Sequence, residues 1–198
     1  MKSMAKMFTA AVAFLAAVTV ADYAAAQPVL GITMAPAKGG AKLTVTSPDF
    51  KAGAALDDKF TQNGENKSPA ISWTKGPAGT QAYVLLTEDA GGNGPNPIIH
   101  WVIYDIPAAA MGLPQGVATD AKPANGNGAT NGMNQRKASG FMGPKPPAGM
   151  THPYHFEVFA LDTKLNLDPA MADRMAVVNA MKDHVLASGE IVVNYTGK

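Results

Sequence analysis

The sequence predicts a mainly antiparallel β protein with one peripheral helix near its C-terminus. Three observations support this fold class. Five or six segments have the pattern of β-strands, a clear helical pattern occurs only late in the chain, and long loops join these segments. The strand candidates are residues 43–46, 70–73, 81–89, 98–106, 154–162 and 190–195.

Two of these segments show how strongly a strand is expected to be buried. Leu43 and Val45 alternate with threonines, which is the period-two pattern of a half-buried strand. Seven of the nine residues from Ile98 to Ile106 are apolar or aromatic, as in a strand buried deep in a sheet. His100 lies within that apolar segment, so its imidazole requires a specific explanation.

The helical pattern lies in residues 168–189. Asp168 is expected to cap the helix and Pro169 to occupy its first position. Gly189 is expected to follow its end. The sequence therefore predicts one helix before the last strand.

Residues 1–26 have the features of a secretory signal peptide. Two lysines precede an apolar run at 8–20, and Ala24 and Ala26 fit a small-residue cleavage site before Gln27. A transmembrane anchor is the weaker interpretation, because the run is short for a bilayer span and rich in alanine. We therefore expect a periplasmic or secreted protein after removal of the signal peptide.

The mature chain is expected to contain a single domain. Residues 27–42 have the proline, glycine, alanine and lysine composition of a flexible tether. Residues 43–198 form a domain of ordinary size. The chain contains no cysteine, which excludes a thiol nucleophile, a thiolate zinc site and a redox role.

Charge composition argues against two classes of partner. Without the leader, basic and acidic side chains balance, so the net charge is about zero. No run of lysine or arginine supplies an electrostatic footprint for nucleic acid. No basic amphipathic helix indicates a membrane-binding face, and no stable membrane span is expected.

Two consecutive loops are expected to form the wall of a site. Residues 119–137 contain Asn-Gly three times and almost no apolar residue, and structureless loops of this length are usually functional or mobile. Residues 140–150 follow, with prolines at 144, 146 and 147 that stiffen the backbone. Both loops precede the strand candidate at 154–162.

Two histidines and a carboxylate indicate a polar pocket at one edge of the sheet. Strict alternation places His100 on the face of Val102 and Tyr104, and it places His152 on the face of Tyr154. Asp89 ends a third strand candidate. For a single histidine, a hydrogen bond to a backbone carbonyl is an equally good explanation, but two at similar strand positions favour a pocket.

The same segments identify a resemblance to a known family. The chain from residue 43 to the C-terminus resembles the phosphatidylethanolamine-binding protein family, and specifically its bacterial Raf-kinase-inhibitor-like branch. Six segments carry the resemblance, and they occur in the family's order. They are NGENKSPAISW (63–73), HWVIYDIP (100–107), LPQG (113–116), GPKPP (143–147), HPYHFEVFALD (152–162) and DHVLASGEIVV (183–193).

The resemblance implies a β-sandwich of two antiparallel sheets with a small pocket for phosphate, a carboxylate or a phospholipid headgroup. It also implies that imidazoles titrating near pH 6.5 bind such anions more tightly in mildly acidic solution. No cofactor or resident metal is implied. The ligand-binding residues that it implies are Asp89, His100, Pro144, Pro146, His152 and Tyr154.

One segment departs from the family pattern. The family usually has Asp-Pro-Asp-Ala-Pro after this strand, whereas this chain has Gly91 where the second aspartate is expected. A pocket with one carboxylate fewer repels anions less, but it is less able to orient a cationic amine. Arg136 and Lys137 are candidates for cationic groups at the rim, or for solvated surface charges.

Three functions therefore remain open at this point. The first is an exported binding protein for a small phosphate- or carboxylate-bearing ligand, without turnover. The second is a hydrolase or metal enzyme that uses the same pocket, because two histidines and a carboxylate can hold a divalent metal. The third is an interaction protein of the protease-inhibitor type, which modulates an envelope or extracellular partner through its loops.

Overall fold

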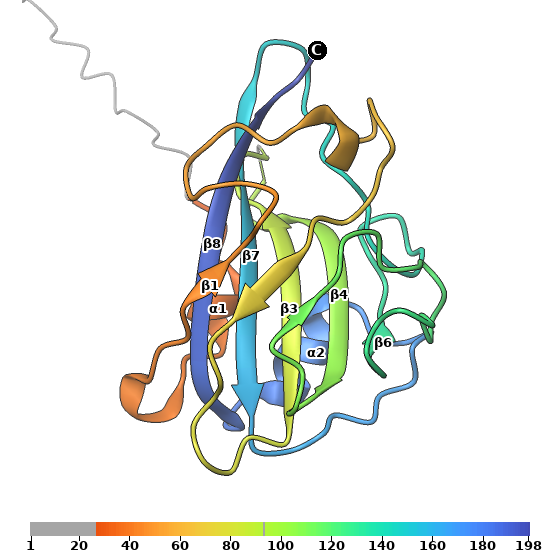
Figure 1. Cartoon of the computed structure of the whole chain (residues 1–198). Coiled ribbons are helices and arrows are strands. Elements are labelled where there is room, and N and C mark those ends of the chain that lie inside the picture. Colours follow the sequence, from red (N-terminus) through yellow and green to blue (C-terminus); the bar gives the residue numbers. More distant parts are fainter. Residues whose placement is uncertain (1–26, 93) are drawn as a thin grey trace, which may run out of the picture.

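The computed structural model of the protein describes residues 27–92 and 94–198. The expected signal peptide at 1–26 lies outside these residues. Among the helices that are described, none has the length and apolar character needed to cross a bilayer. Figure 1 shows two layers of strands, with helix α2 (Arg174–Met181) behind the larger sheet.

The strands form two antiparallel sheets, which confirms the predicted sandwich. The larger sheet has the order β6-β4-β3-β7-β8, and the smaller sheet has the order β1-β2-β5. The larger sheet consists of β3 (Ala82–Asp89), β4 (Ile98–Pro107), β6 (Thr130–Asn131), β7 (Thr151–Leu161) and β8 (Val185–Thr196). The smaller sheet consists of β1 (Val45–Thr46), β2 (Ile71–Trp73) and β5 (Gly112–Leu113).

The central strands β3 and β4 of the larger sheet are buried on both faces. The inner face of this sheet packs against the smaller sheet, and alternate β7 residues such as Tyr154 and Phe156 belong to that core. Its outer face packs against the α2 region, with Phe159 and Leu161 of β7 among the buried residues. Burial on both faces explains why the sequences of β3 and β4 are nearly unbroken runs of apolar residues.

The helix before the last strand is shorter than the sequence predicts. Helix α2 begins after Asp173, whose side chain accepts a hydrogen bond from the Ala176 amide. The predicted helix over 168–189 is therefore wrong at both ends. The helix ends at Met181, because Lys182 has a ψ of 134°, and Val185 already pairs with Leu161 in the larger sheet. Beyond Met181, strand pairing thus takes precedence over the helical pattern.

The segment 27–42, which the sequence predicts to be a flexible tether, contains α1 (Gly31–Met34) and the short 3₁₀ helix η1 (Lys38–Gly40). Its backbone is bonded to buried side chains of the larger sheet and α2. The Gly31 amide donates to Glu88 at 3.0 Å, and the Ile32 amide donates to Glu157 at 2.8 Å. Arg174 donates to the Val29 carbonyl at 2.6 Å. Ala35 is buried in the outer core, and Ile32 and Met34 pack against that core, so polar and apolar contacts together hold the segment.

Candidate functional site

A β-bulge decides where the His100 side chain points. Thr87 pairs with Trp101 and Glu88 pairs with Ile99, so His100 is an extra residue on β4. The alternation changes face at this point. Val102 and Tyr104 belong to the outer core, so the prediction that they share a face with His100 is wrong. The bulge turns the imidazole to the inner face, 5.1 Å from the ring of Tyr154 in an edge-to-face contact.

Asp89 joins the two histidines into one cluster. It is the last residue of β3, is 2% exposed, and pairs in register with Tyr154 on β7. Its Oδ2 atom lies 2.9 Å from His152 Nδ1 and 3.9 Å from His100 Nε2. Its Oδ1 atom accepts from the Gly91 amide at 2.7 Å. Three adjacent strands thus bring Asp89, His100 and His152 together.

The hydrogen bonds assign the same tautomer to both histidines when they are neutral. His100 Nδ1 lies 2.6 Å from the Met142 carbonyl oxygen, which can only accept, so Nδ1 carries the hydrogen. His152 Nδ1 likewise donates to the Asp89 carboxylate. Nε2 of each ring is buried and has no hydrogen-bond partner among residues 27–92 and 94–198. The cluster therefore presents two imidazole nitrogens that a ligand can engage.

Tyr154 supports this cluster from the side of the core. It is 1% exposed, and its hydroxyl group is buried without a hydrogen-bond partner. Burial raises the pKa of this hydroxyl above its ordinary range, and the nearby Asp89 carboxylate acts in the same direction. The Tyr154 hydroxyl therefore stays protonated beside the Asp89 carboxylate.

A small cavity of about 230 Å³ opens beside the cluster. Asp89, His100, His152 and Pro146 line it, so it contains four of the six residues implied by the resemblance. Tyr154 lies behind His100 rather than in the lining, and the Pro144 carbonyl instead accepts from the Gln62 amide at 3.1 Å. The rest of the lining consists of Gln62, Ile98, Gln135, Arg136, Met142, Lys145 and Pro147.

Sequence reasoning missed several lining residues because they come from loops. Gln62 immediately precedes the NGENKSPAISW segment, and Lys145 lies inside the GPKPP segment, between two of its prolines. Gln135 lies beside the start of β4, where its amide donates to the Ile99 carbonyl at 2.8 Å. Of the two candidate rim cations, Arg136 lines the cavity, whereas Lys137 forms an ion pair with Asp173.

The loop 119–137 is held by asparagine side chains rather than by apolar burial. Asn131 is fully buried and accepts a hydrogen bond from Trp101 Nε1 at 2.9 Å. Its amide group donates to the carbonyls of Ala118 and Asp120. These bonds fix the loop that carries Gln135 and Arg136 to the cavity.

The structure gives Gly91 a specific role at the cavity. A Cβ atom at this position would lie 2.7 Å from the Cβ of His152 and even closer to its Cγ. The absence of a side chain therefore lets the imidazole approach the loop and reach Asp89. The departure from the family pattern at Gly91 is coupled to the position of His152.

Burial lowers the pKa of His100 below its ordinary value of 6.5, although the Met142 carbonyl and Asp89 act to raise it. The sequence-based expectation of titration near 6.5 is therefore wrong for this residue. In the folded protein His100 takes up its proton at a lower pH than in the unfolded chain. The stability contributed by neutral His100 is complete above pH 6.5 and is lost as the pH falls below it.

We therefore expect the ligand-free protein to lose up to about 2 kcal/mol more stability between pH 7 and pH 5 than a His100→Gln variant does. Urea unfolding in phosphate-free buffer measures the difference. The matched control is His184→Gln, because His184 is a partly exposed histidine that pairs with Asp162. Equal losses in wild type and His100→Gln would contradict the depressed pKa.

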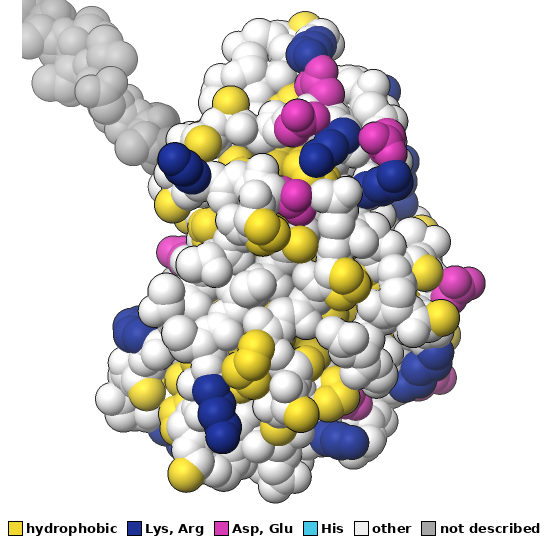
Figure 2. Space-filling model, viewed as in Figure 1, with side chains coloured by type: hydrophobic (Ala, Val, Ile, Leu, Met, Phe, Trp, Pro, Cys, Tyr) yellow, Lys and Arg dark blue, Asp and Glu magenta, His cyan; other side chains and the backbone are white. Residues whose placement is uncertain are grey.

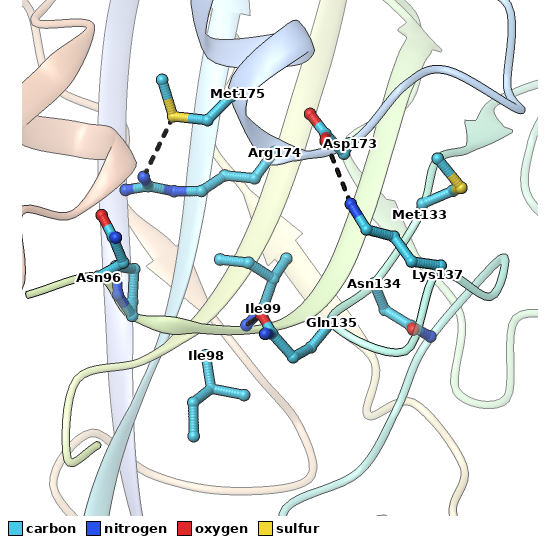
Figure 3. A pocket seen from close by; sticks show the side chains of 11 residues that line it. Asn96, Ile98, Ile99, Met133, Asn134, Gln135, Lys137, Asp173, Arg174 and Met175 are labelled. Carbon is cyan, nitrogen blue, oxygen red and sulfur yellow. Dashed lines mark hydrogen bonds and ion pairs between the residues drawn. The ribbon is translucent and has the colours of Figure 1, made fainter. Parts of the chain in front are cut away.

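A second and larger cavity, of about 350 Å³, lies on the other side of Ile98 and Gln135. Figure 3 shows that its charged groups are already engaged with one another or with neighbours. Lys137 contacts Asp173 at 3.4 Å, and Arg174 forms a 2.7 Å ion pair with buried Glu88. The smaller cavity, with two unpartnered imidazole nitrogens, is the better candidate site despite its size.

The cluster does not have the geometry of a preformed metal centre. In the described part of the chain, Asp89, His100 and His152 do not place one ligand atom each within 4.8 Å of one another.

The surface charge is mixed in sign. On the face drawn in Figure 2, basic and acidic side chains are interspersed around the end of the molecule that carries the C-terminus.

Comparisons with known proteins agree with this fold. A family model for phosphatidylethanolamine-binding protein matches residues 46–196. A UPF0098 protein of Aquifex aeolicus is 36% identical over 162 residues, which cover 79% of this chain and 90% of that protein. The solved structure of Escherichia coli YbcL has a TM-score of 0.73 and 28% identity, and it covers 80% of this chain and 100% of YbcL.

One further relative bears on cellular location. A Mycobacterium tuberculosis protein named as a proposed lipoprotein, LppC, is 32% identical over 135 residues. The match covers 68% of this chain and 63% of that protein.

Proposed function

Because this chain belongs to the phosphatidylethanolamine-binding protein family, we propose that it is an exported protein that binds a small anion or an anionic headgroup in the cavity beside Asp89, His100 and His152. The ligand carries a phosphate or carboxylate group, and it is bound without turnover. Pro146 forms part of the rim, with Pro144 and Tyr154 in supporting positions outside the lining.

The observation that carries the proposal is the pair of buried Nε2 atoms without partners. Buried polar atoms are almost always hydrogen-bonded, so two such atoms beside one cavity are suited to engage a polar ligand that enters it. The cavity volume of about 230 Å³ is below the usual range for drug-sized ligands and suits a headgroup-sized anion. Arg136 and Lys145 add positive charge at the rim.

The tautomers connect binding to pH. A neutral imidazole with its hydrogen on Nδ1 offers only a lone pair at Nε2, which a fully ionised oxyanion cannot use. A proton must therefore enter with the anion, either on His100 or on the ligand. Because burial lowers the pKa of free His100, we expect anion affinity to rise as the pH falls below about 6.5.

Two further observations support parts of this proposal. The sequence of residues 1–26 supports export, and the similarity to a proposed lipoprotein supports an envelope location. A protein partner would meet the rim loops.

Titration calorimetry with inorganic phosphate and with phosphoethanolamine, in metal-free buffer at pH 5.5 and pH 7.5, tests the proposal. We expect saturable binding of one anion, tighter at pH 5.5, and at least tenfold weaker in His152→Ala. Loss of one charge-assisted hydrogen bond, worth about 1.5–3 kcal/mol, accounts for this factor.

The control is His184→Ala, which removes a partly exposed histidine outside the cavity and should leave the affinity unchanged. A preference for phosphoethanolamine over phosphate would identify a headgroup as the ligand. Binding that requires a divalent metal would contradict the proposal in favour of a metal-dependent enzyme. Absence of binding at either pH would leave the loops as an interaction surface.

A further inference from the structure

A second cluster of ionisable side chains lies on the opposite face of the larger sheet. His155, Glu157 and Glu190 project from β7 and β8 on the outer face, whereas His152 and Tyr154 project on the inner face. One potential ligand atom from each of the three lies within 4.8 Å of the others. This cluster is separate from the cavity that binds the proposed anion.

The strand register forces two carboxylates together. Glu157 and Glu190 are direct cross-strand partners, and like charges in such positions are destabilising. His155 offsets part of the repulsion through a 2.8 Å contact between its Nδ1 and Glu190 Oε2. Within 4.0 Å, no lysine or arginine of the described chain forms an ion pair with Glu157 or Glu190.

Glu157 provides the independent sign of a missing partner. Its side chain is fully buried, and its Oε2 atom accepts from the Ile32 amide of α1, which lies next to β7 on this face (Figure 1). Its Oε1 atom is buried and has no hydrogen-bond partner within the described part of the chain. A buried carboxyl group in this condition is costly unless it takes up a proton, pairs with a cation or coordinates one. Without an ion, burial and the neighbouring Glu88 hold the pKa of Glu157 well above its ordinary value, so an ion at this place would displace a proton.

The cluster is also open to solvent on one side. The His155 side chain is 16% exposed and the Glu190 side chain is 36% exposed, so an ion can reach the group from water. Glu157 forms the floor, and the two accessible ligands form the walls. The remaining coordination positions of an ion at this place would be filled by water.

From this geometry we propose that His155, Glu157 and Glu190 form a binding site for a divalent transition-metal ion such as Zn²⁺. One imidazole and two carboxylates are a donor set suited to zinc and less suited to magnesium or calcium, which prefer oxygen ligands alone. A tetrahedral zinc ion holds its ligand atoms roughly 3.4 Å apart. The ligand atoms, now within 4.8 Å of one another, must therefore move closer together when the ion binds. The side chains of His155 and Glu190 make most of this movement, because they face water.

The test is calorimetric titration of the purified protein with Zn²⁺ in a phosphate-free buffer without chelator, supported by the visible absorption of Co²⁺ bound in the same site. We expect one ion per chain, an affinity at least tenfold lower in His155→Ala and in Glu190→Gln, and little response to Mg²⁺. Binding should raise the melting temperature of wild type, because the ion binds the folded chain.

The controls separate this site from other histidines. His184→Ala removes a histidine that also pairs with a carboxylate, at 2.7 Å, but lies outside the cluster, so it should leave zinc binding unchanged. His152→Ala should also bind zinc normally. Glu190→Gln alters a partly exposed side chain, so circular dichroism should show an intact fold.

Three results would overturn the proposal. They are the absence of saturable zinc binding, unchanged affinity in both His155→Ala and Glu190→Gln, and loss of binding in His152→Ala, which would place the ion in the cavity beside Asp89. The first two results do not depend on whether the cavity binds an anion, whereas the third would also bear on the proposed anion site; phosphate titration in metal-free buffer tests that site separately.

Discussion

Replacing Arg174 with methionine is expected to lower the free energy of unfolding by about 3–5 kcal/mol. Arg174 is 6% exposed and forms a 2.7 Å ion pair with Glu88, which is fully buried. The substitution leaves the Glu88 carboxylate charged and without its cation in the interior. It also removes the donor to the Val29 carbonyl and so loosens the segment that carries α1. Urea unfolding at pH 7 measures the change.

The matched control for Arg174→Met is Lys137→Met. Lys137 and Arg174 both line the cavity of about 350 Å³. Lys137 forms an ion pair with Asp173 there, but the Lys137 side chain is 69% exposed, so the loss of this pair should cost less than about 1 kcal/mol. Adding Glu88→Gln to Arg174→Met removes the stranded charge, and the double variant should regain part of the lost stability. A loss below about 1 kcal/mol in Arg174→Met would show that the buried pair is not the main support of this face.

Replacing Gly91 with alanine is expected to weaken phosphate binding by at least tenfold. The new Cβ would lie 2.7 Å from the Cβ of His152, so the imidazole must move away from Asp89. This movement breaks the 2.9 Å bond between His152 and the carboxylate, a contact of the charge-assisted class worth about 1.5–3 kcal/mol. Calorimetry with phosphate at pH 5.5 measures the loss of affinity.

Gly92→Ala provides the matched control for Gly91→Ala. A Cβ at position 92 meets only the Ile98 side chain, at 3.4 Å, which is an ordinary contact. Gly92→Ala should therefore bind phosphate as wild type does, although it changes the same loop by the same group. Similar affinities for the two variants would mean that His152 does not need the space at Gly91.

The site depends on tertiary features that the strand patterns only partly predict. The sequence predicts that a histidine lies in a buried strand, and the bulge determines which core that histidine meets. Without the bulge, strict alternation would place the imidazole with Val102 and Tyr104, away from Asp89. His152 needs no such correction, because β7 alternates regularly from Tyr154 to Leu161.

The sequence by itself determined the fold class, the main strands, the family and the set of residues from which a site was expected. These features depend on local periodicity and on short segments in a fixed order, which are present in the chain before it folds. The two-residue strands β5 and β6, the early end of α2 and the docking of α1 were not predicted. Each depends on a partner that is distant in the sequence.

Only the tertiary structure decided how the polar groups are paired. Asp89 lies 63 residues from His152, and Glu88 lies 86 residues from Arg174. No local pattern can predict such contacts, because hydrogen bonds and ion pairs depend on distances of a few ångströms between separate strands. The same reason explains why the sequence indicated the histidines and prolines of the cavity but missed Gln62, Gln135 and Lys145. Loop residues reach a site through the path of the folded backbone rather than through periodicity.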